Sequence, residues 1–346
     1  MASSLNIHEN IPLAPFTTLK IGGPARYFVK ATHEADVIES FAFAESHNLP
    51  VFVLGGGSNI LVSDAGFDGV VIQIALKGVE ITDETGDGIV TAQAGEDWDE
   101  FVKYSVEREL AGLECLSGIP GFVGGTPVQN VGAYGQEVAE TIISVRCYDR
   151  RDSRFVTLSN EDCGFSYRTS IFNSTERGRY VVLNVSYSLR PGGEPKVAYR
   201  DLIEYFGERR PGLSSTRDAV LRIRRAKSMV IEADDPNSAS AGSFFKNPIV
   251  SIETLSEIRS RRENVPFFEF GDAVKIPAAW LIESSGFHKG FALGRAGIST
   301  NHTLALINRG GATAAEILAL KDLVQKEVLE RFEIELFPEP VFVGFD

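Results

Sequence analysis

Through its first third the chain alternates short apolar runs with an amphipathic segment. The runs at residues 27–29 and 51–54 have the length and composition of buried strands. Between them, apolar positions in residues 34–48 recur at helical spacing, which predicts a helix capped by Thr32 and followed by Pro50. Two further strands are expected at residues 61–62 and 70–74.

A second strand and helix follow, and then a region dominated by strand-like patterns. Residues 89–94 predict a strand and residues 98–110 a helix, with Gly112 as the C-terminal cap of that helix. From residue 142 to residue 189 the pattern is mostly that of strands. Residues 190–210 are charged and broken by prolines, so we expect them to form an excursion from this region.

The last third of the sequence mixes helix and strand. Residues 278–284 predict a short helix and residues 303–307 a strand. A longer helix is expected to begin at Thr313, where Glu316 three residues later completes a capping box. The overall pattern is that of an α+β protein. Its glycine-rich segments do not follow the G-x-G-x-x-G spacing of a dinucleotide-binding βαβ unit.

Two glycine-rich loops give the first indication of chemistry. Residues 55–59 follow a buried strand, and residues 118–127 form a long, nearly uncharged loop with four glycines and two prolines. Glycines let successive backbone N–H groups converge on one point, a geometry that binds diphosphate. The first loop alone is more typical of an ordinary turn, whereas the second is long and rigid and is harder to explain in that way. Together they predict one extended cofactor that contains a diphosphate, such as a dinucleotide.

A third loop, residues 240–248, combines the hydroxyl of Ser243, the cation of Lys246 and the amide of Asn247. Two phenylalanines lie between the hydroxyl and the cation, which predicts a polar pocket with an aromatic wall. The alternative interpretation is a hairpin whose aromatic rings fill a core.

Composition restricts the class of protein. A chain of 346 residues is expected to form two or three domains, and 43% apolar with 23% charged residues is typical of a soluble globular protein. The net charge of −13 argues against a nucleic-acid partner. No apolar run approaches the ~20 residues of a membrane span, and residues 1–10 lack the features of a secretory signal. We therefore expect a cytoplasmic protein that does not bind membranes.

The cysteines and histidines are consistent with that location. The three cysteines, Cys115, Cys147 and Cys163, are few and widely spaced, which favours reduced thiols over a disulfide framework. The five histidines form no pair at metal-ligand spacing, so no bound metal is expected.

Five motifs in a fixed order give the chain a specific resemblance to a known family. The runs at residues 54–59, 117–135, 167–172, 242–248 and 338–340 resemble those of the UDP-N-acetylenolpyruvoylglucosamine reductases, also called UDP-N-acetylmuramate dehydrogenases. The resemblance implies a FAD enzyme of peptidoglycan precursor synthesis. In this family NADPH reduces the flavin, and UDP-N-acetylglucosamine enolpyruvate then enters the same site and is reduced to UDP-N-acetylmuramate, which implies ping-pong kinetics.

The resemblance also implies how the cofactor is bound. Residues 51–64 contain neither His nor Cys, so the FAD is expected to lack a covalent tether. The residues expected to contact it lie on the two glycine-rich loops and just after the second one: Gly55, Gly56, Gly57, Ser58, Asn59, Ser117, Gly118, Ile119, Gly121, Gly124, Gly125, Gln129, Asn130, Gly132 and Tyr134.

Three residues are implied as catalytic. Arg168 would stabilise the negative charge that hydride addition builds on the substrate carboxylate. Ser243 would donate a proton to the α-carbon, and Glu339 would share the developing charge. Substrate contacts are implied for Tyr199, Lys227, Asn247 and His302. The stretch between Lys227 and Ser243 departs from the family pattern, and His302 stands where some relatives have an amide.

The implied architecture has three parts, two of which form a PCMH-type FAD-binding fold. Residues 1–75 with 336–346 are expected to form the first FAD-binding part, residues 76–226 the second, and residues 227–335 the substrate-binding domain. The excursion at residues 190–210 favours the type I form of the family. No obligate protein partner is implied.

Two other functions are compatible with parts of the sequence. An oxidase of small alcohols or lactones would share the flavin fold, but many such oxidases tether the flavin near the first glycine-rich loop. A non-catalytic module that binds a flavin or a nucleotide sugar would explain the glycine-rich loops. It would leave Arg168, Ser243 and Glu339 without a role.

Overall fold

The structure is a computed structural model that describes residues 5–82 and 88–345. The chain divides into two compact units, each built from segments that are distant in sequence. The first unit comprises Met1–Ile11, Ala25–Gly57 and Asp68–Val230, and the second comprises Pro12–Pro24, Ser58–Phe67 and Ile231–Asp346. The chain therefore passes from one unit to the other within the first glycine-rich loop, after Gly57.

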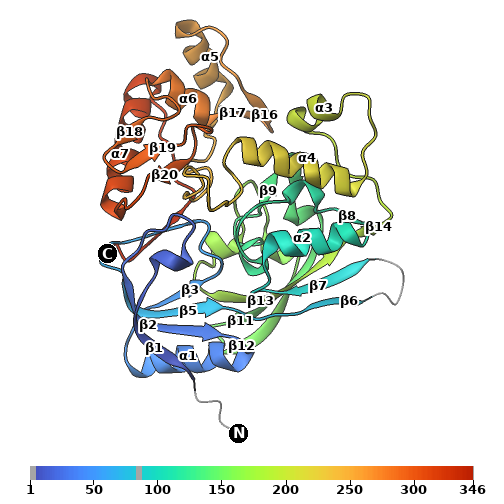
Figure 1. Cartoon of the computed structure of the whole chain (residues 1–346), viewed down its shortest axis with the longest axis vertical. Coiled ribbons are helices and arrows are strands. Elements are labelled where there is room, and N and C mark those ends of the chain that lie inside the picture. Colours follow the sequence, from blue (N-terminus) through green and yellow to red (C-terminus); the bar gives the residue numbers. More distant parts are fainter. Residues whose placement is uncertain (1–4, 83–87, 346) are drawn as a thin grey trace. The chain divides into compact units, whose positions relative to one another are not determined.

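One sheet of the first unit is built from the N-terminal strands. Its order is β1 (Ile7–Pro12), β2 (Pro24–Ala31), β5 (Phe67–Ile74) and β3 (Val51–Leu54), and β3 pairs in parallel with β5. Helix α1 (Glu34–Ser46) lies along this sheet (Figure 1) and contributes Val37 and Ala44 to its core.

Helix α1 begins at Glu34, as predicted, but its N-cap is one residue later than expected. His33, not Thr32, occupies the N-cap position, with an extended φ of −132°. The carboxylate of Asp36 accepts hydrogen bonds from the backbone N–H groups of Thr32, at 2.8 Å, and His33, at 2.9 Å. An acidic residue in the first turn thus closes the helix end, which the pattern of apolar positions does not reveal.

The second sheet of this unit is antiparallel. Its order is β12 (Arg154–Ser159), β11 (Ile142–Asp149), β13 (Tyr180–Ser188), β7 (Ile89–Gln93) and β6 (Val79–Thr82). Helix α2 (Trp98–Glu107) covers it, because the rings of Trp98 and Phe101 pack 6.1 and 5.2 Å from that of Tyr187 on β13.

Helix α2 is shorter than predicted. It ends at Glu107, because Glu109 adopts a left-handed φ of 55° and Leu110–Ala111 form strand β8. Gly112 lies beyond this strand and is not the helix cap. Strand β8 pairs with β14 (Arg190–Pro191), which ties the start of the 190–210 excursion to the first unit.

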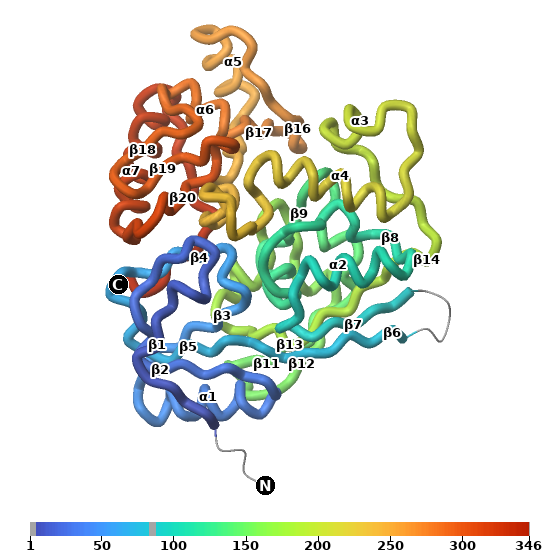
Figure 2. The backbone as a smooth tube through the Cα atoms, viewed as in Figure 1, coloured from blue at the N-terminus to red at the C-terminus, as the bar shows by residue number. Residues whose placement is uncertain are grey.

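The excursion itself contains regular structure. Helix α3 (Arg200–Phe206) packs on α4 (Leu213–Ala226), which the sequence analysis did not predict, and Leu202, Phe206 and Val220 share a small core. Helices α2 and α4 lie side by side (Figure 2). The second glycine-rich loop contacts both of them, because a Cβ on Gly118 would lie 2.7 Å from Leu221 of α4 and the N–H of Trp98 on α2 donates to Gly121. The short hairpin of β9 (Gly132–Ala133) and β10 (Gln136–Glu137) follows this loop.

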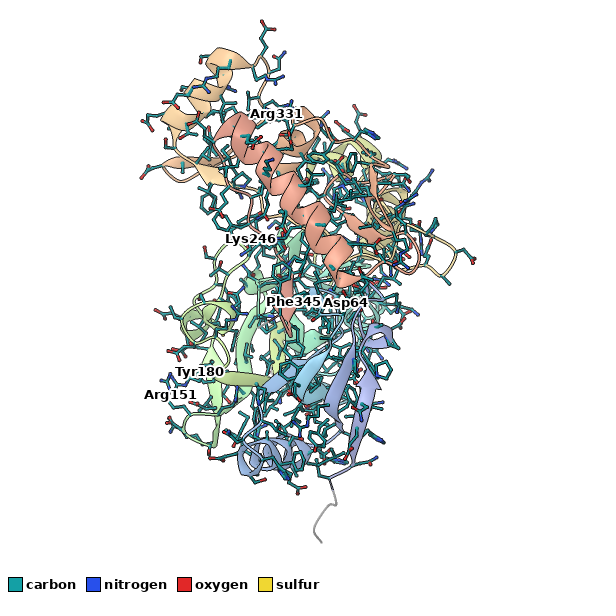
Figure 3. The ribbon with its side chains drawn as sticks, turned by 90° about the vertical axis from the view of Figure 1, so that its left-hand side faces the viewer. Asp64, Arg151, Tyr180, Lys246, Arg331 and Phe345 are labelled. Atoms are coloured by element: carbon teal, nitrogen blue, oxygen red, sulfur yellow. The ribbon has the colours of Figure 1, made fainter. Side chains whose placement is uncertain are left out.

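The second unit has its own core around helix α7 (Ala314–Phe332). Thr313 caps this helix through a capping box with Glu316, as predicted. The carboxylate of Asp64 accepts from the N–H groups of Ala314 and Ala315, and Figure 3 shows Asp64 near this end of the helix and Arg331 at the other.

Short strands and two smaller helices complete the second unit. They are β4 (Ile60–Val62), β15 (Ile249–Val250), α5 (Ile252–Arg261), β16 (Phe268–Phe270), β17 (Ala273–Lys275), α6 (Ala278–Ser284), β18 (Ala292–Leu293), β19 (Ala296–Ile298), β20 (Leu306–Asn308) and β21 (Val341–Val343). Strand β21 pairs in parallel with β4, so the C-terminal strand joins residues 60–62.

The α+β class is confirmed. Most of residues 1–75 and 76–226 belong to the first compact unit. Residues 336–346, which were expected to join residues 1–75, belong to the second compact unit. The division at residues 230/231 lies close to the predicted boundary after residue 226, whereas the finer division of the first unit stays a prediction.

No helix among the described residues is long and apolar enough to span a bilayer. The three cysteines are free and buried.

Candidate active site

The two glycine-rich loops meet in the first unit. A Cβ atom on Gly56 would lie only 2.7 Å from Cα of Gly121, so the backbones approach more closely than any other residue would allow. The carbonyl of Gly121 accepts a hydrogen bond of 3.0 Å from the N–H of Trp98 at the start of α2. Cβ atoms on Gly55 and Gly125 would meet nothing within 4 Å. The loops thus form a backbone surface with open space beside it.

An ion pair that the sequence analysis missed holds the start of the second loop. The N–H of Gly118 donates to the carboxylate of Asp99 on α2 at 2.5 Å, and Arg217 on α4 donates to both oxygens of that carboxylate, at 2.6 and 2.8 Å. Burial alone would raise the pKa of Asp99. The hydrogen bonds from Arg217 and Gly118 outweigh this effect and lower it.

Arg224 lies under the same loop. Its Nη2 donates to the carbonyl of Met229 at 2.7 Å, whereas its buried Nε has no hydrogen-bond partner among the described residues. A Cβ on Gly118 would lie 3.4 Å from this Nε. Burial lowers the pKa of the guanidinium. A buried cation with an unused donor beside a glycine-rich loop fits an anionic or carbonyl-bearing ligand.

Several predicted cofactor residues hold the loop together with their side chains. Ser117 is fully buried and donates to the carbonyl of Glu114 at 2.7 Å. The amide of Asn130 donates to Glu137 at 2.8 Å and to the carbonyl of Ser166 at 3.1 Å. Gly124 packs against Ala94 at the end of β7, Ile119 packs against the first core, and Gln129 is half-buried. The side chains of Ser117 and Asn130 are therefore engaged in hydrogen bonds within the protein.

Arg168 lies against this loop. Its Nη2 donates to the carbonyl of Gly132 at 2.7 Å, and a Cβ on Gly132 would come within 3.1 Å of Nη1. Arg168 itself has a left-handed φ of 53°, inside a tight turn closed by Ser166 and Thr169. A strained backbone that points a half-buried guanidinium at a glycine-rich loop is typical of a functional position.

Tyr134, Tyr199 and Lys227 gather in the first unit. The two tyrosine rings pack edge to face with centroids 5.5 Å apart, and Lys227 Nζ lies 5.9 Å from the Tyr134 ring. Lys227 also donates to Asp201 at 2.6 Å. Burial would lower the pKa of Lys227, but the hydrogen bond to Asp201 raises it. The lysine is therefore held cationic beside two aromatic rings.

The Ser243 loop belongs to the second unit and is pinned by its phenylalanines. Phe244 and Phe245 are fully buried in the core, so the alternative interpretation of these rings as a core plug is the correct one. The N–H of Glu339 donates to the carbonyl of Phe244, and the N–H of Lys246 (labelled in Figure 3) donates to that of Phe337, both at 2.9 Å. Ser243 and Glu339 are therefore carried by two segments bonded to each other.

Other predicted residues lie around this loop. The ring Nε2 of His302 is 3.4 Å from the Ser243 hydroxyl. Asn247 caps helix α6 by accepting from the N–H of Ala278 at 2.9 Å, a structural role that the sequence did not suggest. Asn59 donates to the carbonyl of Glu339 at 3.2 Å. Thr18 donates to the carbonyl of Ser240 at 2.6 Å and to that of Ser58 at 3.4 Å.

The structure thus brings the predicted residues together in two sets. The first unit holds Gly55 to Gly57, the second glycine-rich loop, Arg168, Tyr134, Tyr199 and Lys227. The second unit holds Ser58, Asn59, Ser243, Asn247, His302 and Glu339. Within the described ranges, no group of His, Cys, Asp and Glu side chains could hold a metal ion.

Comparison with known proteins gives the family. A model described as "UDP-N-acetylenolpyruvoylglucosamine reductase, C-terminal domain" matches residues 234–343, and one described as "FAD binding domain" matches residues 25–159. The UDP-N-acetylenolpyruvoylglucosamine reductases of Thermobifida fusca and Streptomyces coelicolor are each 45% identical over 97% of this chain, which covers 98% and 90% of their lengths.

A solved structure agrees with these matches. The crystal structure of UDP-N-acetylenolpyruvylglucosamine reductase from Thermus caldophilus has a TM-score of 0.67 and 26% identity. The match covers 98% of this chain and 100% of the chain in that crystal structure. The resemblance drawn from the five motifs is confirmed, and the chain belongs to the UDP-N-acetylenolpyruvoylglucosamine reductase family.

Proposed function

We propose that this protein uses FAD and NADPH to reduce UDP-N-acetylglucosamine enolpyruvate to UDP-N-acetylmuramate. The observation that carries the proposal is the arrangement of the Ser243 loop, which the core phenylalanines anchor and a backbone hydrogen bond joins to Glu339. The two segments that carry these polar side chains are thereby held together within one unit. A protein that only bound a nucleotide would have no need to fix them.

The first unit fits FAD. Gly55 and Gly125 border open space, Gly56 and Gly121 bring the two loops together, and Arg224 offers a buried donor beside Gly118. These residues would hold the diphosphate and the polar edge of the flavin through backbone N–H groups and one guanidinium. The chemistry supplied by bound FAD is acceptance of a hydride from NADPH and its delivery to the β-carbon of the enolpyruvyl group.

The residues of the chain act on the substrate. Arg168 stabilises the enolate charge on the carboxylate, because a guanidinium fixed to Gly132 costs no reorganisation during the reaction. Ser243 gives its hydroxyl proton to the α-carbon. Glu339 shares the charge at the carboxylate, and Lys227, which Asp201 keeps cationic, binds a substrate phosphate together with Tyr199.

One assay tests the proposal. We expect the purified protein to bind FAD without a covalent tether and to consume NADPH steadily only when the enolpyruvyl sugar nucleotide is present, with UDP-N-acetylmuramate as product by mass spectrometry. At low substrate concentrations, double-reciprocal plots of initial rate against NADPH concentration, made at several fixed concentrations of the sugar nucleotide, should give parallel lines, as in a ping-pong mechanism. A flavin that precipitates with the acid-denatured protein would favour an oxidase of small alcohols or lactones. NADPH consumption that does not depend on the sugar nucleotide would contradict the proposal. The cytoplasmic location and the type I subclass stay predictions.

A further inference from the structure

His302 lies on a turn that is tightly built into the second unit. The N–H of Ser299 donates to the carbonyl of Ala305 at 2.9 Å, and the N–H of Ala305 donates to that of His302 at 3.1 Å. Ser299 and Thr303 are almost completely buried, and Thr303 donates to the carboxylate of Glu283 on α6. The imidazole is therefore presented from a rigid support.

The same turn is joined to the Ser243 loop. The N–H of Phe244 donates to the carbonyl of Leu304 at 2.8 Å, which aligns the two segments side by side. This alignment places Nε2 of His302 at 3.4 Å from Oγ of Ser243, in a partly buried position. The hydrogen bond is long, as catalytic hydrogen bonds often are before substrate binds.

We propose that His302 is a further catalytic residue, which returns the proton that Ser243 gives to the substrate. The proposal rests on the proposed function. When the C–H bond forms at the α-carbon of the enolate, the Ser243 O–H bond breaks. The protonated imidazole then gives its Nε2 proton to the serine oxygen, so the O–H bond reforms as the N–H bond breaks, and the neutral imidazole regains a proton from water.

A proton relay from His302 would compensate for the weak acidity of the Ser243 hydroxyl. A free hydroxyl is a poor proton donor near neutral pH, because the alkoxide it leaves is unstable. A histidine titrates close to neutral pH and exchanges protons with water rapidly, so it removes that penalty. This is the role of the Ser–His pair in acyl transfer run in the opposite direction, with histidine as the acid.

Three charged residues lie on the turn of His302 or on the segments bonded to it. Glu283 accepts from Thr303 on the same turn, Lys246 lies on the Ser243 loop, and Glu339 lies on the segment bonded to that loop. We expect the rate of the proton step to fall at alkaline pH, where an imidazole is neutral and has no proton to give.

Stopped-flow absorbance tests the proposal one half-reaction at a time. The holoenzyme is reduced with NADPH and then mixed with saturating enolpyruvyl sugar nucleotide over the pH range in which histidine titrates. For H302Q we expect flavin reduction by NADPH to be unchanged and reoxidation by the substrate to be about 10- to 100-fold slower, without the alkaline decline. Glutamine can still donate a hydrogen bond to Ser243 but cannot relay a proton. H8Q, at an exposed position on β1, is the control and should match wild type.

NMR gives a readout that does not depend on turnover. In the ¹⁵N-labelled oxidised holoenzyme, the ring of His302 should titrate with the pKa seen in the kinetic profile, and S243A should shift it. If H302Q binds substrate more weakly but reoxidises at the wild-type rate when saturated, or if it keeps the alkaline decline, the proposal is overturned and His302 is a binding residue. Failure of the wild-type flavin to be reoxidised by the substrate would instead overturn the proposed function, and this inference with it.

Discussion

The glycine-rich loops that meet in the first unit and the Ser243 loop of the second unit differ in which part of the chain they expose. The former expose backbone groups, and the latter exposes a side chain. In the first unit, side chains such as Ser117 and Asn130 are used internally, and the backbone at Gly55 and Gly125 borders open space. In the second unit, Phe244 and Phe245 are buried, and it is the side chain of Ser243 that remains partly accessible. The first is a surface of backbone groups, and the second is a platform for side chains.

This difference determines what a substitution does. On a backbone surface, an added Cβ obstructs the ligand, whereas the loss of a side chain disturbs the loop. On a side-chain platform, a side chain can be removed with little effect on the fold, because the neighbouring core residues and backbone hydrogen bonds hold the segment. The predictions below test this contrast.

The largest effect is expected for S243A. Flavin reduction by NADPH should stay near the wild-type rate, and reoxidation by the enolpyruvyl substrate should fall about 10²- to 10⁴-fold, because a placed proton donor is lost. The free energy of unfolding should barely change, since Phe244 and Phe245 keep the loop in the core. Stopped-flow absorbance of the flavin measures each half-reaction separately.

The matched control is S256A, which removes a serine hydroxyl from the exposed face of helix α5. It should leave both half-reactions unchanged. An S243A variant that is reduced slowly but reoxidised normally would remove Ser243 from the proton-donor role.

A second prediction concerns the backbone surface. G55A and G125A add a methyl group that meets nothing within 4 Å, and neither glycine has a left-handed φ. The free energy of unfolding of the FAD-free protein should therefore be nearly unchanged, while FAD affinity should fall about 10- to 100-fold because the methyl occupies the ligand's space. Flavin fluorescence titration and urea unfolding measure the two quantities.

G124A is the contrasting variant. Its Cβ would lie 2.6 Å from that of Ala94, so it should destabilise the fold itself. If G55A and G125A bind FAD as wild type does, the open space beside these glycines is not the cofactor site.

The glycine-rich loops could be located from the sequence, and the structure brings two of their glycines together, while their role in binding FAD stays a prediction. A close backbone approach such as that of Gly56 to Gly121 needs glycine, so it is visible in the sequence. The pairing of Asp99 with Arg217 was missed, because it joins two helices and one of them, α4, was not predicted. Arginines interrupt the apolar positions of helix α4, so its sequence resembles a basic segment exposed to solvent.

Helix ends and short strands show the same limit. Helix α6 was predicted at its observed bounds, and α7 at its observed start, where the capping box is local in sequence. The early end of α2 was missed, because β8 forms only through its pairing with β14, some 80 residues away along the chain. Asn247 was expected to bind substrate, yet its contact with Ala278 depends on how α6 packs. Local signals were thus predictable, and roles created by distant partners were not.

A third prediction returns to the first unit, where Asp99 fixes the loop at Gly118. D99N should lower the free energy of unfolding by about 1–3 kcal/mol, because Arg217 and the Gly118 N–H lose a charged acceptor. Since the pKa of Asp99 is lowered in the folded state, its contribution is present above the unfolded value of about 3.9 and is lost as the pH falls through the folded value. Urea unfolding of both proteins from pH 3 to pH 7 should show their stabilities converging at acid pH. A constant difference would contradict this assignment.

The smallest effect is expected at the start of helix α7, in the second unit. Thr313 satisfies the N–H of Glu316, while Asp64 satisfies those of Ala314 and Ala315. T313A and D64A should each lower the free energy of unfolding by about 1 kcal/mol, since both remove acceptors from the N–H groups of the first turn. Because the hydrogen bonds that these two side chains make among the described residues go to the start of α7, FAD affinity should not change. A loss of FAD affinity in either variant would mean that the backbone surface depends on the second unit's core, and the contrast between the two regions would fail.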